Sequence, residues 1–575
     1  MYILGLATMG DAAAVLMKGN EIIAAAEEER FSRQKHHVGF PNEAVKYCLR
    51  EAGITMNEVS HVGLYWKPWL VKTRVKMALG SLFKKGDGLF AARVNSGLPR
   101  VSKYMSMFGI PKYIRGTFGE SDFKFHFISH HDCHAASAFY VSPFKSAAIL
   151  TLDGAGEESS TVLAHGIDNQ RIRNIADVKL PHSLGQFYSA VTNYLGFNMF
   201  EGDEWKVMGL AAYGKPVYYD FLKDNVLTMK GDRDFEFNVS VLDHHLAKSH
   251  RFSAEFVEAC GLPRKPDEEI LQRHMDLAAS AQKVVEEIVL KLCQTLKSET
   301  GEDNLCLAGG VAYNSVMNGR LVRESGFKKV FVQPAAGDSG CAMGAALFIA
   351  HVKLGLPRGK AMDNAYFGPG FSDQDCLEAL EQSGLPFETV PEDELTKKVA
   401  KILADGNLIA WFQGRMEWGP RALGNRSFVG DPRMADMREV LNHKVKLREW
   451  FRPLAPSMLA EDAVEVFGED FFDPFMVTVH PVPEDRRNRI AAVVHVDGTA
   501  RPQTVQREVN PRYWQLLQDF KAETGVPVLL NTSFNIQEPI VCTPEDAIST
   551  FQRCDVDYLV LGNNIASRPP KALAA

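Results

Sequence analysis

One local pattern occurs twice in the chain: an apolar strand, a turn containing aspartate and glycine, and further apolar strands. The first copy reads YILGL, TMGD, AAAVLM, KGN and EIIAAAEEE (2–29), and the second reads AAILTL, DGAGEESS, TVLAH, GIDN and RIRNI (147–175). Short apolar runs between such turns are typical of antiparallel hairpins. The repetition predicts a duplicated lobe, whereas two ordinary hairpins are the simpler alternative.

The remainder of the first half alternates helices with strands that end in glycine. Apolar residues at helical spacing predict a helix over 271–299, with Gly301 as its C-terminal stop. The segments LCLAGGVAYNSVMNGRL (305–321) and VFVQPAAGDSGCAMGAALFIA (330–350) each read as strand, glycine-rich turn and helix. Such turns suit nucleotide binding in α/β folds.

A stretch rich in glycine and proline, 353–373, predicts a boundary between two domains. Beyond it, segments with apolar residues at helical spacing alternate with segments typical of strands, which predicts a second α/β or α+β domain. Its expected helices are 392–404, 434–443 and 510–524, and its expected strands are NLIAWF (407–412), AAVVHV (491–496) and VPVLLN (526–531).

Composition excludes several classes of protein. The 575 residues carry a net charge of −7, which argues against a general nucleic-acid binder. The nine cysteines include no Cys-x-x-Cys pair, a pattern typical of a reducing compartment rather than a disulfide framework. Neither a signal peptide nor an apolar run of membrane-spanning length is evident. We therefore expect a cytoplasmic protein without membrane or nucleic-acid partners.

The stretch GRMEWGPRALGNRSFVGDPR (414–433) places several arginines among glycine and proline residues. It contains Arg415, Arg421, Arg426 and Arg433, with Glu417 and Asp431 as the only carboxylates. Because a loop cannot bury so many guanidiniums without anions, and arginine matches phosphate oxygens, a polyanion site is the first hypothesis. Further cationic, amide and hydroxyl groups of this half are Lys444, Lys446, Arg448, Arg452, Arg501, Asn531 and Ser533.

A candidate metal site lies in the first half. His130 and His134 of SHHDCHAASAFY stand at i and i+4, so a helix would place both imidazoles on one face. Asp153 and Asp338 follow apolar strands in glycine-rich turns and are the best candidates for carboxylate ligands. The alternative is that the histidines cap or pack locally.

A charged segment, EEERFSRQKHHVGFP (27–41), has two interpretations. It is either an ordinary solvated charge run, or it brings Lys35 and His36 into a cleft.

These motifs, taken in order, closely resemble the ATP-dependent O-carbamoyltransferases of the NodU/CmcH/TobZ family, which act on Nod factors and antibiotics. The resemblance covers nearly the whole chain; its C-terminal motifs are highly specific, whereas its glycine pairs are not. The matching segments are EEERFSRQKH, HHDCHAAS, LTLDGAGE, KVMGLAAYG, LAGGVAYN, GDSGCAMGAAL, GRMEWGPRALGNRS, KLREWFRPLAPS, HVDGTARPQTV and LNTSFN.

The resemblance implies an α/β protein of two domains. Residues 1–355 would form an actin/sugar-kinase-like (ASKHA) domain with duplicated lobes, and residues 366–570 a YrdC-like domain. The second domain would make carbamoyl adenylate from carbamoyl phosphate and ATP, with Mg²⁺ as the partner of ATP, and release pyrophosphate. The first domain would use its metal, iron by resemblance, to carbamoylate a hydroxyl of a small-molecule or glycan acceptor. The family also suggests a homodimer.

The resemblance further implies roles for individual residues. The metal ligands would be His130, His134, Asp153 and Asp338. Nucleotide contacts in the first domain would be Gly154, Gly156, Glu157, Gly309, Gly310 and Asn314. Carbamoyl phosphate and ATP would contact Arg421, Lys446, Arg452, Arg501, Asn531 and Ser533, of which Arg421, Arg452 and Asn531 are assigned to catalysis together with Lys35, which would touch the carbamoyl adenylate.

The chain departs from the family at Gly10, in ATMGDAA, where relatives commonly have a histidine. If that histidine deprotonates the acceptor, this chain lacks the base, and general bases contribute ~10²–10⁴-fold in rate. Three explanations stay open: His36, His37 or His131 substitutes for it, the acceptor is more acidic, or the enzyme uses a different transfer step.

Three other functions are compatible with parts of the sequence. A transferase that makes threonylcarbamoyladenosine on tRNA would use the same two folds, although the acidity of the chain opposes it. A non-catalytic nucleotide-binding regulator would explain Gly10, and a sugar kinase would leave the arginine-rich half unexplained. The acceptor could be an aminoglycoside, a macrolide, a glycolipid sugar or a surface polysaccharide. Residues 64–120 and 217–265 are expected to select it.

Overall fold

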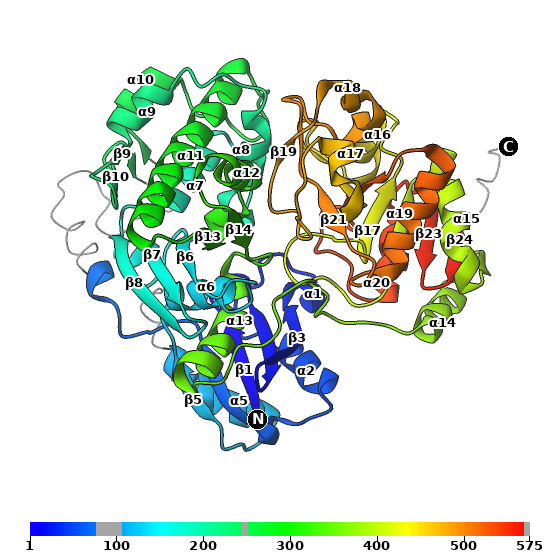
Figure 1. The fold of residues 1–575 in the computed structure, drawn as a ribbon, viewed down its shortest axis with the longest axis horizontal. Coiled ribbons are helices and arrows are strands. Elements are labelled where there is room, and N and C mark those ends of the chain that lie inside the picture. The colour runs from blue at the N-terminus through cyan, green and yellow to red at the C-terminus, as the bar shows by residue number, and fades with distance from the viewer. Residues whose placement is uncertain (76–105, 244–250, 569–575) are drawn as a thin grey trace. The chain divides into compact units, whose positions relative to one another are not determined.

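The computed structural model describes residues 1–75, 106–243 and 251–568 and is mixed α/β (Figure 1). The chain forms two units. Unit 1 comprises Met1–Glu28 and His36–Met362, and unit 2 comprises Glu29–Lys35 and the chain from Asp363 onward. Two regions, 64–120 and 217–265, were expected to select the acceptor. Residues 76–105 of the first and 244–250 of the second lie outside the described residues.

Unit 1 contains two five-stranded sheets that repeat one topology, in the orders β3-β2-β1-β4-β5 and β8-β7-β6-β13-β14. In each sheet the first three strands along the chain pair antiparallel, and the remaining two add in parallel. Both predicted hairpins are therefore confirmed. The strands are β1 Tyr2–Ala7, β2 Ala13–Lys18, β3 Glu21–Glu27, β4 Val59–Leu64, β5 Lys124–Phe127, β6 Ala147–Leu152, β7 Ser159–Ile167, β8 Arg171–Lys179, β13 Asn304–Ala308 and β14 Lys329–Val332.

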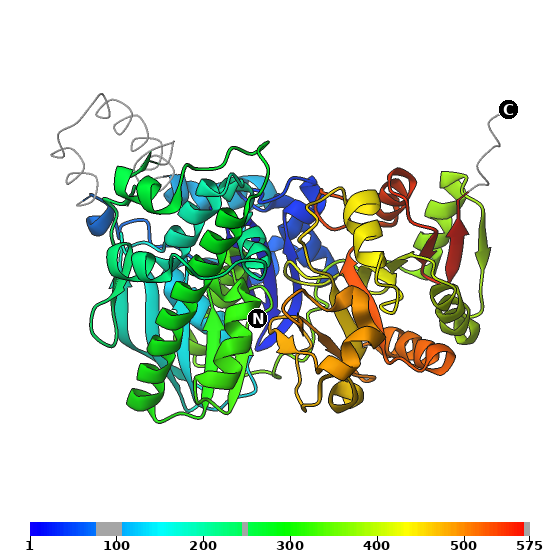
Figure 2. The same ribbon diagram turned by 90° about the horizontal axis from the view of Figure 1, so that it is seen from above.

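Helices cover these sheets, and the long α11 lies against β6 and β7 in both views (Figure 2). The helix predicted over 271–299 is confirmed as α11, and Gly301 ends it in the left-handed conformation at φ +67°. The helices of unit 1 are α2 Asn42–Glu51, α5 Ile110–Phe118, α6 His130–Phe139, α7 Leu184–Tyr194, α8 Glu204–Ala211, α9 Tyr219–Asn225, α10 Ala254–Cys260, α11 Gln272–Thr300, α12 Ser315–Glu324 and α13 Asp338–Phe348; its short ribbons are β9 Leu227–Met229 with β10 Phe235–Phe237, and β11 Leu242–Asp243 with β12 Arg251–Phe252.

Small residues allow α13 to approach its neighbours at backbone distance. A Cβ on Gly5 of β1 would lie 1.9 Å from the carbonyl oxygen of Ala342 in α13. A Cβ on Gly344 of α13 would lie 1.9 Å from the carbonyl oxygen of Cys133 in α6. Glycine at these two positions therefore permits the packing that sets α13 against both β1 and α6.

Unit 2 is built on a mixed eight-stranded sheet in the order β15-β24-β23-β16-β17-β22-β18-β21. Its strands are β15 Phe387–Thr389, β16 Ile409–Phe412, β17 Arg426–Gly430, β18 Ala455–Leu459, β21 Gln503–Val505, β22 Val528–Ser533, β23 Tyr558–Leu561 and β24 Asn564–Ser567, with a short ribbon of β19 His480–Pro481 and β20 Thr499–Ala500. Its helices are α1 Glu29–Ser32, α14 Asp373–Ser383, α15 Glu392–Ala404, α16 Met437–Val440, α17 Ala463–Phe467, α18 Glu484–Arg487, α19 Pro511–Thr524 and α20 Pro544–Arg553.

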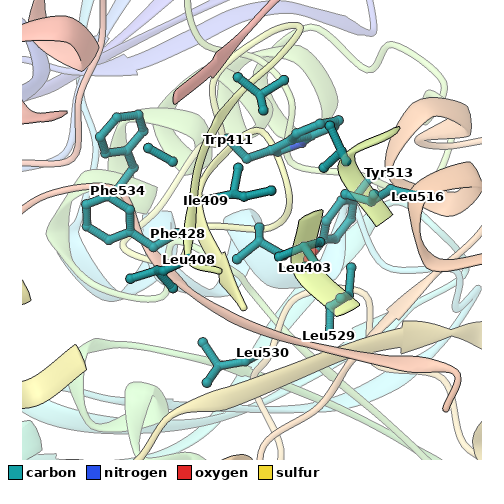
Figure 3. Packing of buried hydrophobic residues seen from close by; sticks show 14 of the residues in the cluster. Leu403, Leu408, Ile409, Trp411, Phe428, Tyr513, Leu516, Leu529, Leu530 and Phe534 are labelled. Carbon is teal, nitrogen blue, oxygen red and sulfur yellow. The ribbon is translucent and has the colours of Figure 1, made fainter. Parts of the chain in front are cut away.

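The core of unit 2 lies between this sheet and its helices (Figure 3). Trp411 of β16 is fully buried, and its indole N–H donates to the carbonyl of Gly424 at 2.9 Å. Gly424 has φ +98°, and a Cβ there would lie 2.3 Å from the ring of Tyr513. This glycine therefore anchors the arginine-rich loop to the core.

Two predicted elements of this half are wrong in detail. The segment AAVVHV (491–496) is not a strand: Asn488–Val493 forms a 3₁₀ helix, with Ile490 and Val493 buried. A short apolar run is buried equally well in either form, so its pattern does not distinguish them. The helix expected over 434–443 is a short α16 followed by a π-helical turn, Leu441–Val445.

The close packing of α13 leads to a stability prediction. Gly344→Ala should lower the free energy of unfolding by about 1–3 kcal/mol, because the added methyl overpacks α13 against α6. Gly116→Ala is the matched control: Gly116 is an exposed glycine of α5, a Cβ there would meet no atom outside its own helix within 4 Å, and alanine should be neutral or slightly stabilising. Denaturant unfolding measures both variants, and equal midpoints would contradict the packing argument.

Candidate functional site

The first candidate site is a buried cluster in unit 1, built where both sheets end. His130 and His134 lie in the first two turns of α6, and Asp153 follows the last residue of β6. Asp338 is the first residue of α13, whose N-terminus is fixed by the packing on β1 and α6. One ligand atom of each of these four side chains lies within 4.8 Å of the others.

Distances within the cluster fit a metal ion. The Nε2 atoms of His130 and His134 are 3.0 Å apart, and His130 Nε2 is 3.1 Å from Asp153 Oδ2 and 3.7 Å from Asp338 Oδ1. Metal ions in proteins lie about 2.0–2.2 Å from such ligands, so neighbouring ligand atoms of one ion are separated by about 3 Å. The residues present can therefore hold a divalent metal.

The protonation of the cluster reflects its burial and crowding. Burial opposes the charged form of His130, but the hydrogen bond with Asp153 and the charge of Asp338 outweigh it and raise the pKa of His130 to about 9. Burial, opposed by His130, raises the pKa of Asp338 to about 7. Burial and the neighbouring His130 hold the pKa of His134 well below its usual value. In metal-free protein, His130 thus carries a proton that a metal must displace.

Neighbouring groups hold the ligands in place. The backbone N–H of Gly310 donates to Asp153 Oδ1 at 2.9 Å, and Tyr65 Oη, just after β4, donates to Asp338 Oδ2 at 3.2 Å. The carboxylate of Glu157 accepts from the N–H of His130 at 3.1 Å and so caps the N-terminus of α6. A second group, His130, His134 and Cys341, also lies within 4.8 Å.

Tyr65 and Cys341 were not singled out from the sequence. Cys341 stands at i+3 from Asp338, a spacing that places both on one face of α13. Tyr65 directly follows a strand that is parallel to its neighbours, the edge at which ligands usually bind.

The predicted nucleotide contacts of this unit also have roles in its fold. Asn314 caps α12, accepting from the N–H of Met317 at 3.0 Å, and its amide N–H₂ donates to Gln282 at 2.8 Å. Gly309, at φ +97°, leaves no room for a Cβ beside the backbone of Leu152. Gly154 and Gly156 lie in the turn after β6, together with Glu157. A nucleotide contact at these residues and at Gly310 stays a prediction.

The second candidate site is a cationic cluster in unit 2, formed by Lys35, Arg421, Lys446, Arg448, Arg452 and Arg501. The ammonium of Lys446 is buried and donates to Ser533 Oγ at 3.0 Å and to Asn535 Oδ1 at 2.7 Å, at the end of β22. Burial, then the positive charges of Arg448 and Arg452, hold the pKa of Lys446 well below its usual value, with Lys35 adding to the effect. Glu449, whose carboxylate lies 3.8 Å from Arg452 and also acts on Arg448, offsets only part of this positive charge, and the remaining like charges repel one another.

Arg501 extends the same cluster. Burial and the charges of Arg421 and Arg448 lower the pKa of its guanidinium, and its Nε is buried without a hydrogen-bond partner among the described residues. Asn531 Nδ2 donates to Ser457 Oγ at 2.9 Å and to the carbonyl of Ala422 at 3.2 Å, while its Oδ1 likewise has no partner in the described part of the chain. Such buried, unsatisfied groups indicate a site that a polar ligand completes.

Binding of a polyanion would explain only some of the arginines in the loop 414–433. Arg426 is fully buried, donates to the carbonyls of Gln413 and Gly414, and lies over the ring of Phe412 at 3.6 Å. Arg433 pairs with Asp431 at 2.6 Å. Backbone carbonyls and an aromatic face thus replace the expected anions at these positions.

Arg415 has the same structural role, since it donates to the carbonyls of Phe367 and Gly368. The buried carboxylate of Glu417 accepts from three N–H groups, those of Leu423, Asn425 and Arg426. The hypothesis therefore holds at most for Arg421 among the four arginines of the loop.

Comparison with known proteins identifies the family. The family model described as carbamoyltransferase N-terminus matches residues 2–347 of this chain, and the model described as carbamoyltransferase C-terminus matches residues 400–568. The chain belongs to the carbamoyltransferase family. This result confirms the resemblance seen in the sequence and makes the protein a carbamoyltransferase-family enzyme.

Relatives extend over almost the whole length of this carbamoyltransferase-family chain. An uncharacterized protein of Synechocystis sp. is 42% identical over 99% of this chain and 97% of its own length. Nodulation protein NolNO of Sinorhizobium fredii is 38% identical over 97% of this chain and 79% of its own. Nodulation protein U of the same species is 27% identical over 93% of this chain and 94% of its own.

Solved structures resemble the chain only distantly. HypF of T. kodakarensis covers 62% of this chain, with 48% of its own length, at 14% identity and a TM-score of 0.31. The activator of 2-hydroxyisocaproyl-CoA dehydratase from Clostridium difficile covers 61%, with 94% of its own length, at a TM-score of 0.28 and 14% identity. No helix among the described residues is both long and apolar enough to cross a membrane.

Protonation of the buried cluster leads to a prediction about metal binding. Because the pKa values of His130 and Asp338 are raised to about 9 and about 7, both groups bind protons that a metal displaces. Apparent metal affinity should therefore rise as the pH increases toward about 9 and level off above it. Calorimetric titration of metal-free protein in two buffers of different ionisation enthalpy should show at least one proton released per ion at neutral pH.

His134→Gln should lower metal affinity at least tenfold. The matched control is His165→Gln, since His165 pairs with Glu302 at 2.7 Å, outside the cluster. Full metal content in the His134 variant, or binding without proton release, would refute the assigned site.

Proposed function

We propose that the enzyme is an ATP-dependent O-carbamoyltransferase that works in two steps. Residues 366–570, a YrdC-like domain, make carbamoyl adenylate from carbamoyl phosphate and ATP. Residues 1–355, an ASKHA-type domain, then transfer the carbamoyl group to a hydroxyl of a small-molecule or glycan acceptor.

The observation that carries the first step is the cationic cluster of unit 2. Burial, and then the positive charges of neighbouring members, lower the pKa of Lys446 and of Arg501, so a ligand with several negative charges would stabilise these groups. ATP with carbamoyl phosphate meets this requirement. Charge builds on the transferring oxygens during adenylation, and Arg421, Arg452 and Arg501 are the groups that would stabilise it.

Mass balance adds a product to this step. Carbamoyl phosphate contains its own phosphoryl group, whereas carbamoyl adenylate retains only the α-phosphate of ATP. Adenylation therefore consumes one water and releases orthophosphate together with pyrophosphate. Lys446, which donates to Ser533 and Asn535 at the end of β22, would bind the departing phosphate.

The buried cluster of unit 1 supports the second step. His130, His134, Asp153 and Asp338 would hold the metal, for which we propose iron, and a bound metal there supplies Lewis-acid polarisation of a carbonyl. The chain's own groups fix this arrangement: Gly310 N–H orients Asp153, and Tyr65 orients Asp338. A cytoplasmic homodimer without membrane or nucleic-acid partners completes the proposal.

Pyrophosphate release tests the first step directly. The purified protein should form pyrophosphate and orthophosphate from ATP only when carbamoyl phosphate is present. Arg452→Ala should lower this rate by about 10²–10³-fold, the usual effect of removing one charge-stabilising donor. Arg489→Ala is the matched control, because Arg489 is an exposed arginine paired with Glu465. Pyrophosphate formation at the same rate without carbamoyl phosphate, or at the wild-type rate in Arg452→Ala, would refute the adenylation step.

Removal of the metal separates the two steps. Treatment with a chelator that is then dialysed away, with Mg²⁺ restored for ATP, or His134→Gln, should leave pyrophosphate formation within about twofold of the wild type, because the cationic cluster lies in the other unit. Transfer of carbamoyl adenylate should be abolished. Equal loss of both steps would contradict the division of labour.

A further inference from the structure

Transfer of a carbamoyl group to a hydroxyl needs a group that accepts the hydroxyl proton. The imidazoles of the metal cluster are unsuitable, since His130 and His134 direct Nε2 at each other and His130 also at Asp153. His131 is enclosed, because its Nδ1 pairs with Thr151 Oγ1 at 2.8 Å and its Nε2 with the carbonyl of Ser159 at 2.9 Å. An accepting group must therefore lie outside α6.

His36 has the required surroundings. Its side chain is 42% exposed, and its Nδ1 lies 2.6 Å from Asp11 Oδ1. A carboxylate at Nδ1 fixes the tautomer that leaves Nε2 able to accept a proton, and it stabilises the imidazolium formed afterwards. Nε2 of His36 lies 3.0 Å from the backbone carbonyl oxygen of Glu201, to which it donates its proton, so the exposed Nε2 must lose that proton to solvent before it can act as a base.

Asp11 connects this imidazole to the metal cluster. Its charge acts on Asp338 and contributes to the raised pKa of that carboxyl group. The residue before it, Gly10, faces the same carboxylate: a Cβ on Gly10 would lie 2.9 Å from Asp338 Oδ2. Because Gly10 has no side chain, it does not cover the carboxylate of Asp338, and the next residue, Asp11, pairs with His36.

The backbone is specialised around this pair. Asp11 and His36 both adopt positive φ, +37° and +51°, which non-glycine residues rarely do outside sites that over-determine them. Gly202 has φ +68°, and a Cβ there would lie 2.8 Å from His36 Nε2. Only glycine at 202 leaves room for the ring, so two segments distant in sequence hold one imidazole in place.

We propose that His36, oriented by Asp11, is the general base of carbamoyl transfer, an inference that rests on the proposed function. After Nε2 has lost its proton to solvent, the acceptor hydroxyl takes the place of the carbonyl of Glu201 beside Nε2 and gives its proton to that nitrogen. The hydroxyl oxygen forms a bond to the carbamoyl carbon, and the bond from that carbon to the phosphate oxygen breaks. AMP leaves with the electron pair, and the imidazolium returns its proton to solvent.

The test follows ATP labelled at the α-phosphate under single turnover, with metal-loaded enzyme in excess, carbamoyl phosphate present and water as the acceptor probe. The label passes first into enzyme-bound carbamoyl adenylate and then into AMP. His36→Gln should form the adenylate at the wild-type rate and release AMP ~10²–10⁴-fold more slowly. Asp11→Asn should show a smaller loss in the same step.

Two further variants separate chemistry from folding. His165→Gln, the matched control at a histidine that also pairs with a carboxylate (Glu302, 2.7 Å), should behave as the wild type in both steps, and metal content should be unchanged in all variants. Gly202→Ala should slow AMP release, because its methyl displaces the His36 ring. AMP release at the wild-type rate in His36→Gln would overturn the assignment of the base. Absence of labelled adenylate in the wild type would overturn the proposed function and the inference together.

Discussion

The backbone contact between α13, α6 and β1 is the constraint on which the site of unit 1 depends. Gly344 and Gly5 allow this approach, and with any larger residue α13 would stand farther from α6. Because Asp338 begins α13 and the two histidines lie on α6, this packing fixes the separation between the carboxylate and the imidazoles. The glycine-rich motif GDSGCAMGAAL is thus explained first by helix packing, and only through it by chemistry.

In unit 2 the constraint is electrostatic, because several positively charged side chains lie close together. Lys446 donates to Ser533 and Asn535, and Arg426 is surrounded by carbonyls and an aromatic face. These contacts satisfy hydrogen bonds but do not cancel the positive charge. The fold therefore tolerates the cluster at a cost in stability, which the proposed anionic substrates would offset on binding.

The sequence predicted features that depend on local pattern and missed those that depend on tertiary contacts. Spacing in HHDCH and the glycine-rich turns that contain Asp153 and Asp338 were enough to find the four members of the buried cluster that could hold a metal. The role of Arg426 could not be inferred, because the carbonyls that surround it come from the chain's path rather than from residue identity. The prediction of a strand at AAVVHV was wrong for a related reason. An apolar run indicates that a segment is buried, but it does not identify the part of the chain against which the segment packs.

Consecutive residues of one short segment contribute to different units. Residues 29–35 lie in unit 2, where Arg33 donates to the carbonyl of Ile540 at 2.8 Å and Lys35 adds to the charge around Lys446. His36 belongs to unit 1, where it pairs with Asp11. A charge run that composition alone would assign to solvent is therefore divided between the two units, and in the proposed function its lysine would act on the anion and its histidine on the acceptor. Substitutions at 35 and 36 should consequently affect different steps, although one peptide bond joins the two residues.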